Sequence, residues 1–406
     1  MGYKKTAVKG VSWITFLRVS TRAITILRFS ILGRLLTPAQ FGFFGIASLI
    51  LSLLEVITET GINIFLVQDK RGIKEHINSA WVVSIIRGIV LTLLILLLAP
   101  FIASFFNAER AYKTIVFMAI IPFIRGFINP GIIAYQKELQ FHKEFRLRFI
   151  LFLIDVVVAT AFAFITRDAT SFVYGLIASA ILEVILSFAL VPIWPKLQFE
   201  YEKVKHIFHR GWWVTITGIF SYLADNGDNL MVGKLLGSSS LGIYQVAYRF
   251  STLSISEITN VVNQVTFPVY VKFAEDKARL WKAFLKVTFV SSLIAFFLGG
   301  AIFIFAKPII LFFMGQQWTS AIPVIQVLAI YGILRTIFGN FAPVFLAVGK
   351  QNYVAQMTFC RVIGLLLLIT PLIISYGMVG AGYAMLFSIL IEIPMILYFA
   401  HIVFKK

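Results

Sequence analysis

The chain has 406 residues, of which 59% are hydrophobic and 13% are charged, with 36 Lys and Arg against 18 Asp and Glu. Soluble domains carry about twice that share of charged residues, so the composition excludes a soluble protein and indicates an integral membrane protein. An aromatic content of 15% excludes an intrinsically disordered chain, and a single cysteine excludes a fold held by internal disulfides.

Twelve apolar stretches follow one another along the chain, and each is long enough to cross a bilayer as a helix. Their predicted limits are 11–36, 41–67, 79–106, 111–136, 147–166, 170–194, 208–236, 240–271, 282–313, 319–347, 353–375 and 379–403. Each stretch is continuously apolar, which excludes transmembrane strands, because these alternate between apolar and polar residues. The first stretch lacks a small-residue cleavage site, so we expect it to be retained rather than removed as a signal peptide. The predicted fold class is therefore an all-α integral membrane protein with twelve transmembrane helices.

Lysine and arginine residues are distributed unevenly between the connections that join these helices. The termini and the loops at 68–78, 137–146, 195–207, 272–281 and 348–352, with their flanks, hold 21 of the 36 basic residues. The alternate connections and their flanks hold six. Because cytoplasmic loops are enriched in Lys and Arg, we predict that both termini and the basic loops are cytoplasmic. Topology thus explains most of the basic excess, and no nucleic-acid partner is expected.

The first predicted turn recurs in the second half of the chain. Residues 33–44 and residues 233–244 share a glycine, a basic residue, two leucines and a second glycine at an offset of 200. Six predicted helices separate the two copies, so both have the same orientation, which indicates a parallel repeat about an axis along the membrane normal. We therefore predict two lobes of six helices related by a pseudo-two-fold axis, residues 1–200 and 201–406. Two such lobes imply a central cavity and alternating access.

Nine basic residues lie inside the predicted helices, where a charge at the bilayer centre costs about 2.5–3.5 kcal/mol unless it finds a partner or water. Residues equidistant from a predicted turn lie at similar depth on neighbouring helices. This rule predicts four ion pairs, which are Arg18–Glu59, Arg22–Glu55, Asp228–Arg249 and, more loosely, Arg125–Asp155. Three arginines have no evident acidic counterpart, and these are Arg28, Arg335 and Arg361.

Unpaired arginines beside a cavity fit a substrate that carries phosphate, because a guanidinium group binds phosphate oxygens in a bidentate manner. The alternative is that they contact backbone carbonyls or lipid headgroups. The candidate substrate-binding cations are Arg18, Arg22, Arg28, Arg125, Arg249, Arg335 and Arg361.

Acidic and amide side chains accompany these arginines inside the predicted helices. The acids are candidate charge partners or sites of H⁺ or Na⁺ coupling, and they are Glu55, Glu59, Asp155, Glu183, Asp225 and Asp228. Asp155 and Glu183 either exchange a proton as a pair or each meet an arginine. Polar residues also follow single helix faces beyond the charges, which indicates a water-lined wall. Its candidate members are Asn63, Asn226, Asn229, Gln245, Ser256, Asn260 and Asn263.

The sequence contains no motif that is typical of an enzyme. It has no nucleotide-binding phosphate loop and no nucleophile elbow, and its five histidines do not have the spacing of metal ligands. We therefore expect a protein that is not an enzyme and that has no resident cofactor or metal.

Three segments are similar to those of a known transporter family. Leu32–Gly42 resembles the first-hairpin signature of the polysaccharide transporter family, the Wzx-like oligosaccharide flippases. Thr60–Gln68 resembles the end of their second helix, and Asp228–Tyr244 resembles the repeat in their second half. The resemblance implies membership of the multidrug/oligosaccharidyl-lipid/polysaccharide (MOP) exporter superfamily, with a MATE-like arrangement of two six-helix lobes around a V-shaped cavity.

The resemblance also implies a function, the export of a polyprenyl-pyrophosphate-linked oligosaccharide that serves as the repeat unit of an O-antigen, capsule or exopolysaccharide. The substrate would move from the cytoplasmic to the outer leaflet of the bacterial inner (plasma) membrane by alternating access. Its expected partners are membrane lipids and glycan polymerase machinery. The alternative is a MATE-like, cation-coupled exporter of small molecules or drugs, which would place unpaired acids in its cavity.

Overall fold

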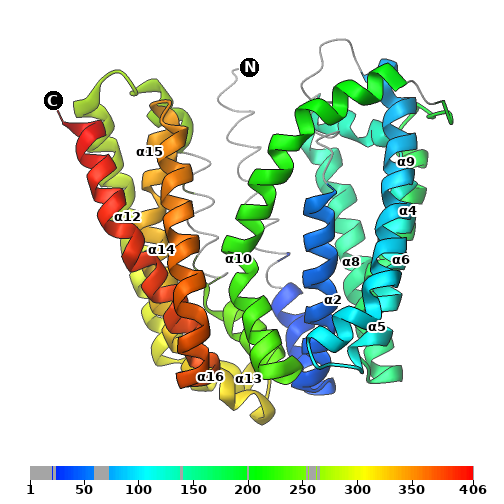
Figure 1. Cartoon of the computed structure of the whole chain (residues 1–406), viewed down its shortest axis with the longest axis horizontal. Helices are drawn as coiled ribbons and strands as arrows, with labels where there is room; N and C mark the ends of the chain where they lie inside the picture. The colour runs from blue at the N-terminus through cyan, green and yellow to red at the C-terminus, as the bar shows by residue number, and fades with distance from the viewer. Residues whose placement is uncertain are drawn as a thin grey trace. The chain divides into compact units, whose positions relative to one another are not determined.

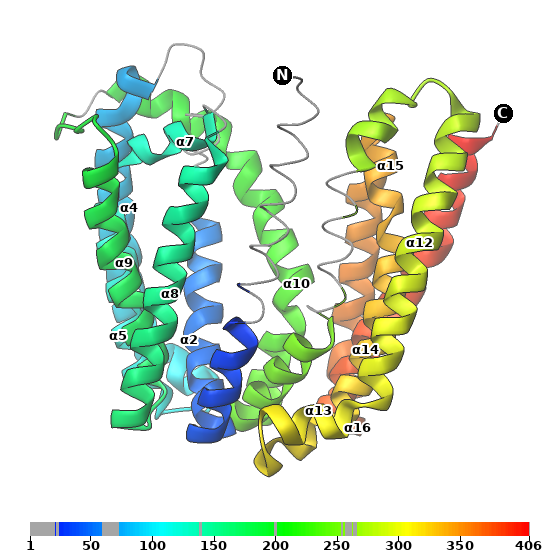
Figure 2. The same ribbon diagram turned by 180° about the vertical axis from the view of Figure 1, so that it is seen from behind.

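The computed structural model describes residues 21, 24–58, 73–137, 140–198, 201–252, 255, 262 and 266–405, and every regular element in these ranges is a helix (Figures 1 and 2). The all-α fold class is therefore confirmed. The chain forms two compact units, Met1–Ile219 and Phe220–Lys406, here called the first unit and the second unit. The boundary between them falls inside the helix α10 (Tyr201–Phe250).

The helices of the first unit follow the predicted apolar stretches, but the stretch 111–136 is broken into shorter helices. After helical residues 24–35 come α2 (Pro38–Ile57), α4 (Ile73–Phe105), α5 (Ala111–Met118), α6 (Ile120–Gly126), η1 (Pro130–Ile133), α7 (Ala134–Lys137), α8 (Phe141–Thr166) and α9 (Thr170–Leu190). The Thr92 hydroxyl of α4 donates to the Ala119 carbonyl oxygen at 2.8 Å. The carbonyl oxygen at the break between α5 and α6 therefore has a hydrogen-bond donor from a neighbouring helix.

The first predicted turn is found where the sequence indicates it. Thr37 and Gln40 form a reciprocal capping box at the start of α2, and Pro38 occupies the first helical position. The side-chain amide of Gln40 also donates to the carbonyl oxygen of Arg167 at 2.6 Å. Arg167 ends α8 with a left-handed backbone (φ 48°), so one side chain both begins α2 and satisfies the end of α8.

The second unit contains two long segments that turn back on themselves at a glycine. Its elements are the remainder of α10, then α12 (Lys277–Ile304), α13 (Ala306–Phe313), η2 (Gln316–Ala321), α14 (Ile322–Gly339), α15 (Phe341–Ala347) and α16 (Gln351–Phe404). The backbone leaves helical geometry at Gly237 (φ 80°) in α10 and at Gly377 (φ 59°) in α16. Both values favour glycine, which has no Cβ to clash. Each segment thus contains two helical limbs, as the predicted stretches on either side of these glycines require.

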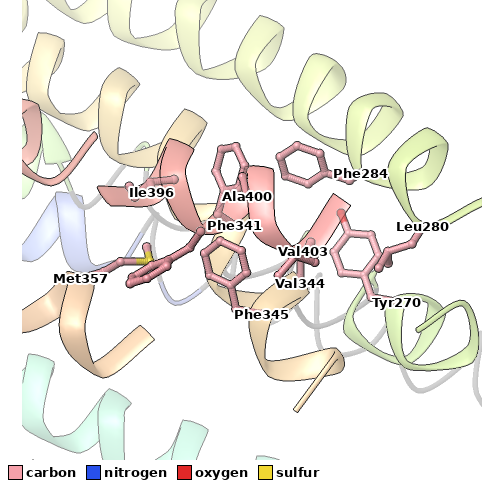
Figure 3. Packing of buried hydrophobic residues seen from close by; sticks show 11 residues of the cluster. Tyr270, Leu280, Phe284, Phe341, Val344, Phe345, Met357, Ile396, Ala400 and Val403 are labelled. Atoms are coloured by element: carbon pink, nitrogen blue, oxygen red, sulfur yellow. The ribbon is translucent and has the colours of Figure 1, made fainter. Parts of the chain in front are cut away.

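A buried apolar cluster holds α12, α15 and both ends of α16 together (Figure 3). The ring centroids of Phe284 and Phe341 lie 4.5 Å apart. Tyr353, near the start of α16, stacks on Phe399, near its end, with ring centroids 4.1 Å apart. The start and the end of α16 therefore lie side by side, which confirms that the segment reverses direction at Gly377.

The surface of the described residues is that of a membrane protein. Among the residues that the structure describes, seven helical segments are long and apolar enough to cross a bilayer. Large apolar side chains such as Ile165 (78% exposed) and Leu97 (68% exposed) lie on the outside, and a soluble monomer does not expose apolar surface on this scale. The chain is therefore a multi-pass membrane protein. The count of twelve helices, the lobe boundary at 200/201 and the pseudo-two-fold relation stay predictions.

Candidate substrate-binding cavities

Each unit contains a polar cavity of its own. The second-unit cavity has a volume of about 680 Å³ and is lined by residues of α10, α14, α15 and α16. The first-unit cavity has a volume of about 650 Å³ and is lined mainly by residues of α2, α4, α6, α8 and α9. Both volumes lie within the range of small-molecule binding sites.

Charged groups of both signs line the second-unit cavity. Three guanidinium groups (Arg249, Arg335 and Arg361) face two carboxylates (Asp225 and Glu392), so the charge of the lining is positive. Three predicted members of the polar wall, Asn226, Asn229 and Gln245, also line it. The predicted residues Asn63, Ser256, Asn260 and Asn263 lie outside the described residues.

Arg335 is held in place by three oxygen atoms. Its Nη2 donates to Oδ1 of Asp225 at 3.2 Å, and its Nη1 donates to the hydroxyls of Tyr248 at 3.3 Å and Tyr331 at 3.4 Å. The prediction that Arg335 has no acidic counterpart is therefore wrong. The partner lies on α10, which is not the neighbour of α14 in the chain, and comparison across a single turn does not detect such a contact.

Arg361 also has an acidic partner, which the sequence reasoning missed. Its Nη1 lies 4.0 Å from Oε2 of Glu392, whose side chain is only 8% exposed. The two residues stand on opposite limbs of α16, nearly equidistant from Gly377. Glu392 is the single acidic residue in the stretch 379–403, so the sequence does contain the signal for this pair.

Asp228 is fully buried and meets neutral donors rather than the predicted Arg249. Its Oδ2 accepts from the Tyr244 hydroxyl at 2.8 Å, and its Oδ1 accepts from the backbone and side-chain amides of Asn229 at 2.8 and 3.0 Å. No ion pair between Asp228 and Arg249 is present in the described part of the chain. Equal distance from a turn fixes depth but not the direction of the side chain around the helix, so the prediction was wrong.

In the first-unit cavity, Arg125 of α6 lies between two carboxylates. Its guanidinium nitrogens are 3.8 Å from Oε1 of Glu55 on α2 and 3.9 Å from Oε2 of Glu183 on α9. Arg87, which sequence reasoning did not select, donates to the backbone oxygen of Glu55 at 2.7 Å. The predicted pairing of Glu55 with Arg22 and of Arg18 with Glu59 involves residues outside the described ranges.

Arg28 and Asp155 form a buried ion pair that lines neither cavity. Two guanidinium nitrogens donate to the two carboxylate oxygens at 2.5 and 3.0 Å, and both side chains are nearly inaccessible. The centroid of the Phe172 ring lies 5.6 Å from the guanidinium carbon of Arg28. The predictions that Arg28 has no acidic counterpart and that Asp155 pairs with Arg125 are thus wrong. Of the two alternatives for Asp155 and Glu183, the structure shows that each meets an arginine.

Comparison with known families and folds agrees with this architecture. Residues 31–323 match the model of a family described as polysaccharide biosynthesis protein. The teichuronic acid biosynthesis protein TuaB of Bacillus subtilis strain 168 is 24% identical over 366 residues, covering 86% of this chain and 72% of TuaB. The lipopolysaccharide biosynthesis protein WzxC of Escherichia coli strain K12 is 23% identical over 399 residues, covering 97% of this chain and 80% of WzxC.

Solved structures show the same fold at low sequence identity. The lipid II flippase MurJ in an inward closed conformation superposes with a TM-score of 0.80 at 14% identity, covering 95% of this chain and 87% of MurJ. An inward-facing MATE family transporter of the MOP superfamily superposes with a TM-score of 0.72 at 15% identity, covering 96% of this chain and 98% of the transporter. The fold is therefore that of MOP superfamily transporters, and the chain belongs to the polysaccharide biosynthesis protein family.

Proposed function

We propose that this protein is a flippase that moves a polyprenyl-pyrophosphate-linked oligosaccharide from the cytoplasmic to the outer leaflet of the bacterial plasma membrane by alternating access. The substrate is the repeat unit of an O-antigen, capsule or exopolysaccharide. The observation that carries the proposal is the second-unit cavity, which combines an excess of guanidinium groups with three side-chain amides. The names of TuaB and WzxC, which refer to polysaccharide biosynthesis, support the same substrate class.

The chemistry of the cavity suits both parts of such a headgroup. A guanidinium group has five N–H donors, so Arg335 and Arg361 keep donors for phosphate oxygens while each contacts a carboxylate. The amides of Asn226, Asn229 and Gln245 suit sugar hydroxyls, since an amide both donates and accepts. This assignment makes the protein a transporter that does not alter its substrate.

The membrane potential favours the proposed direction. With a negative cell interior, moving negative charge outward is favourable by about 2.3 kcal/mol per elementary charge per 100 mV. The proposal includes coupling to H⁺ or Na⁺ through Glu55, Glu183, Asp225 or Asp228. A glycan polymerase, which would use the exported repeat unit, is the proposed partner.

The test is transport by the full chain in proteoliposomes that contain a fluorescent polyprenyl-pyrophosphate-linked sugar. Arg335→Gln and Arg361→Gln are each expected to reduce the transport rate about tenfold or more, because each removes a charged donor from the cavity. The matched control is Arg279→Gln, which removes an exposed arginine that pairs with Asp276 at 3.1 Å outside the cavity. Transport at the wild-type rate in both cavity variants, at normal protein yield, would contradict the proposal.

The same proteoliposomes separate this function from the alternative of a cation-coupled drug exporter. A flippase of anionic lipid is expected to leave the distribution of the cationic dye ethidium unchanged under an imposed proton or sodium gradient. Ethidium transport that depends on the gradient, together with no transport of the lipid-linked sugar, would favour the MATE-like exporter.

A further inference from the structure

The side-chain oxygen of Asn229, in the second-unit cavity, receives no hydrogen bond from the described residues. Asn229 lines the cavity, and its side chain is largely buried, with the residue 6% exposed. Its Nδ2 donates to Oδ1 of Asp228 at 3.0 Å, whereas its Oδ1 is buried and has no hydrogen-bond partner among the described residues. A buried acceptor in this state destabilises the protein unless a donor reaches it.

The orientation of this amide is fixed by the residues behind it. Both oxygens of Asp228 already accept hydrogen bonds, from Asn229 on one side and from the Tyr244 hydroxyl on the other. Rotating the amide by half a turn would place its oxygen against the Asp228 carboxylate, which is electrostatically unfavourable because both atoms only accept. Asp228 and Tyr244 are therefore positioning residues that hold the Asn229 amide with its Oδ1 as the atom that lacks a hydrogen-bond donor.

An acceptor of this kind requires a ligand group that donates. A pyrophosphate offers acceptor oxygens, which suit the guanidinium groups of the cavity rather than Asn229. Asn229 follows Asp225, the partner of Arg335, by one helical turn, or about 6 Å along α10. A sugar attached directly to the pyrophosphate carries hydroxyls, and in an N-acetylated amino sugar an amide N–H, at about that separation from the anion.

We propose that Asn229, positioned by Asp228 and Tyr244, recognises a hydroxyl or amide N–H of the sugar next to the pyrophosphate. The inference rests on the proposed function, and it adds a residue that determines which sugar is accepted. The anion supplies affinity through the arginines, and the donor on the sugar supplies selectivity through Asn229.

Two soluble probes separate these contributions in binding experiments with the purified full chain. One is farnesyl pyrophosphate, and the other is farnesyl pyrophosphate linked to a single N-acetylglucosamine. The variant Asn229→Leu is expected to weaken binding of the sugar-bearing probe about tenfold while binding of farnesyl pyrophosphate is unchanged. Tyr244→Phe is expected to reduce the preference for the sugar-bearing probe by a smaller factor than Asn229→Leu does. It removes the hydrogen bond that holds Asp228 but leaves the Asn229 acceptor in place.

A matched control addresses the loss of a buried amide as such. Asn340 resembles Asn229 in its surroundings, since it is 1% exposed and its Nδ2 donates to the Ser291 hydroxyl at 2.8 Å. Its Oδ1 also has no hydrogen-bond partner among the described residues. Unlike Asn229, it does not line the second-unit cavity. Asn340→Leu is therefore expected to leave the sugar preference unchanged. A second test needs no variant, because sugar probes with single hydroxyls replaced by fluorine remove one donor at a time from the ligand of the wild-type protein.

The outcomes distinguish this inference from the proposed function. If Arg335→Gln weakens both probes but Asn229→Leu weakens them equally or not at all, the anion site is supported and the role of Asn229 is overturned. A panel in which no fluorinated probe and no 2-deoxy probe, which lacks the acetamido group, binds more weakly than its parent overturns it as well. If the wild-type protein binds neither probe, or binds both regardless of Arg335 and Arg361, the proposed function itself fails.

Discussion

The carboxylate of Asp155 lies against Gly175. Because glycine has no side chain, the carboxylate occupies the space that a Cβ atom at position 175 would fill. A Cβ atom at position 175 would lie 2.5 Å from Oδ1 of Asp155, 2.6 Å from its backbone oxygen and 2.8 Å from the Cβ of Ala159. Two of these atoms belong to backbone or to a short side chain and have little room to move. Gly175 thus lets α9 approach α8 closely enough for the Arg28–Asp155 pair to be enclosed.

Gly175→Ala is therefore expected to destabilise the first unit by about 1–3 kcal/mol, the usual effect of overpacking. The measurement is the melting temperature of the purified protein in detergent. The control is Gly300→Ala, because a Cβ atom at position 300 meets nothing within 4 Å. A melting temperature of Gly175→Ala equal to that of the control would show that α8 and α9 can separate freely.

Replacement of Arg28 by leucine is expected to destabilise the protein by about 3–5 kcal/mol, because it removes the only cation that the structure shows hydrogen-bonded to the buried carboxylate of Asp155 among the described residues. The double variant Arg28→Leu with Asp155→Leu removes both charges and is expected to recover most of the loss. Thermal unfolding of the two variants side by side tests this. A double variant that is no more stable than the single variant would indicate that Arg28 has a role beyond this ion pair.

The residues also show how far sequence reasoning reaches. Comparison across single turns finds contacts between consecutive helices, and it points to Arg361 and Glu392 once Gly377 is taken as the turn. Arg28 meets a residue 127 positions away and Arg335 meets one 110 positions away, so their partners depend on packing between helices that are not consecutive. Sequence reasoning thus selected these arginines by residue type and by their place in predicted helices, but the partners of Arg28 and Arg335 required the structure.

At the scale of elements, the turns were more predictable than the helices they join. Thr37, Pro38 and Gln40 specify a helix start by capping chemistry, and Gly237 lies at the predicted turn between two limbs. The breaks at Ala119 and Asn340 were not predicted, because both occur inside apolar stretches without a strong helix-breaking signal at that point. A hydroxyl from a neighbouring helix supports the first break, and hydropathy carries no information about such a contact.

The start of α9 provides a prediction of pH dependence. Burial raises the pKa of Asp168, but hydrogen bonds from Thr170, Lys113 and the Ala169 amide outweigh this and hold the pKa below its ordinary value of 3.8. The ionised side chain therefore contributes stability above pH 3.8, and the contribution is lost as the pH falls through the lowered pKa. Asp168→Asn is expected to melt at a lower temperature than the wild type at pH 7, with a difference that shrinks toward pH 3. A difference that is constant with pH would exclude this contribution.

For the whole molecule, the membrane class followed from composition, since so apolar a chain has no soluble fold. The all-α class followed from the long, continuously apolar stretches, which exclude transmembrane strands. Membership of the family and the MOP fold agree with the resemblance carried by Leu32–Gly42 and Asp228–Tyr244. The predicted helix count and orientation rest in part on the distribution of Lys and Arg between the loops. This distribution acts while the chain inserts into a membrane, so it is tested by locating the loops in a membrane. These two properties are open to direct test.

Single cysteines introduced by Ser239→Cys and Lys205→Cys, in a chain with Cys360→Ser, are expected to react with a membrane-impermeant maleimide from opposite sides. The twelve-helix arrangement places residue 239 outside and residue 205 in the cytoplasm. Labelling in intact spheroplasts and in inverted vesicles provides the comparison. Reaction of both positions from the same side would refute the predicted topology.

The ion pairs also differ in when their members meet during synthesis, since the chain emerges from its N-terminus. Arg361 and Glu392 belong to the two limbs of α16, so they can enter the bilayer together as a hairpin whose charges already offset each other. Arg28 is synthesised 127 residues before its partner Asp155, and Asp225 is synthesised 110 residues before its partner Arg335. The buried Arg28–Asp155 pair of the first unit therefore forms only after the fifth predicted helix has been made. Until then, Arg28 depends on water, lipid headgroups or the insertion machinery.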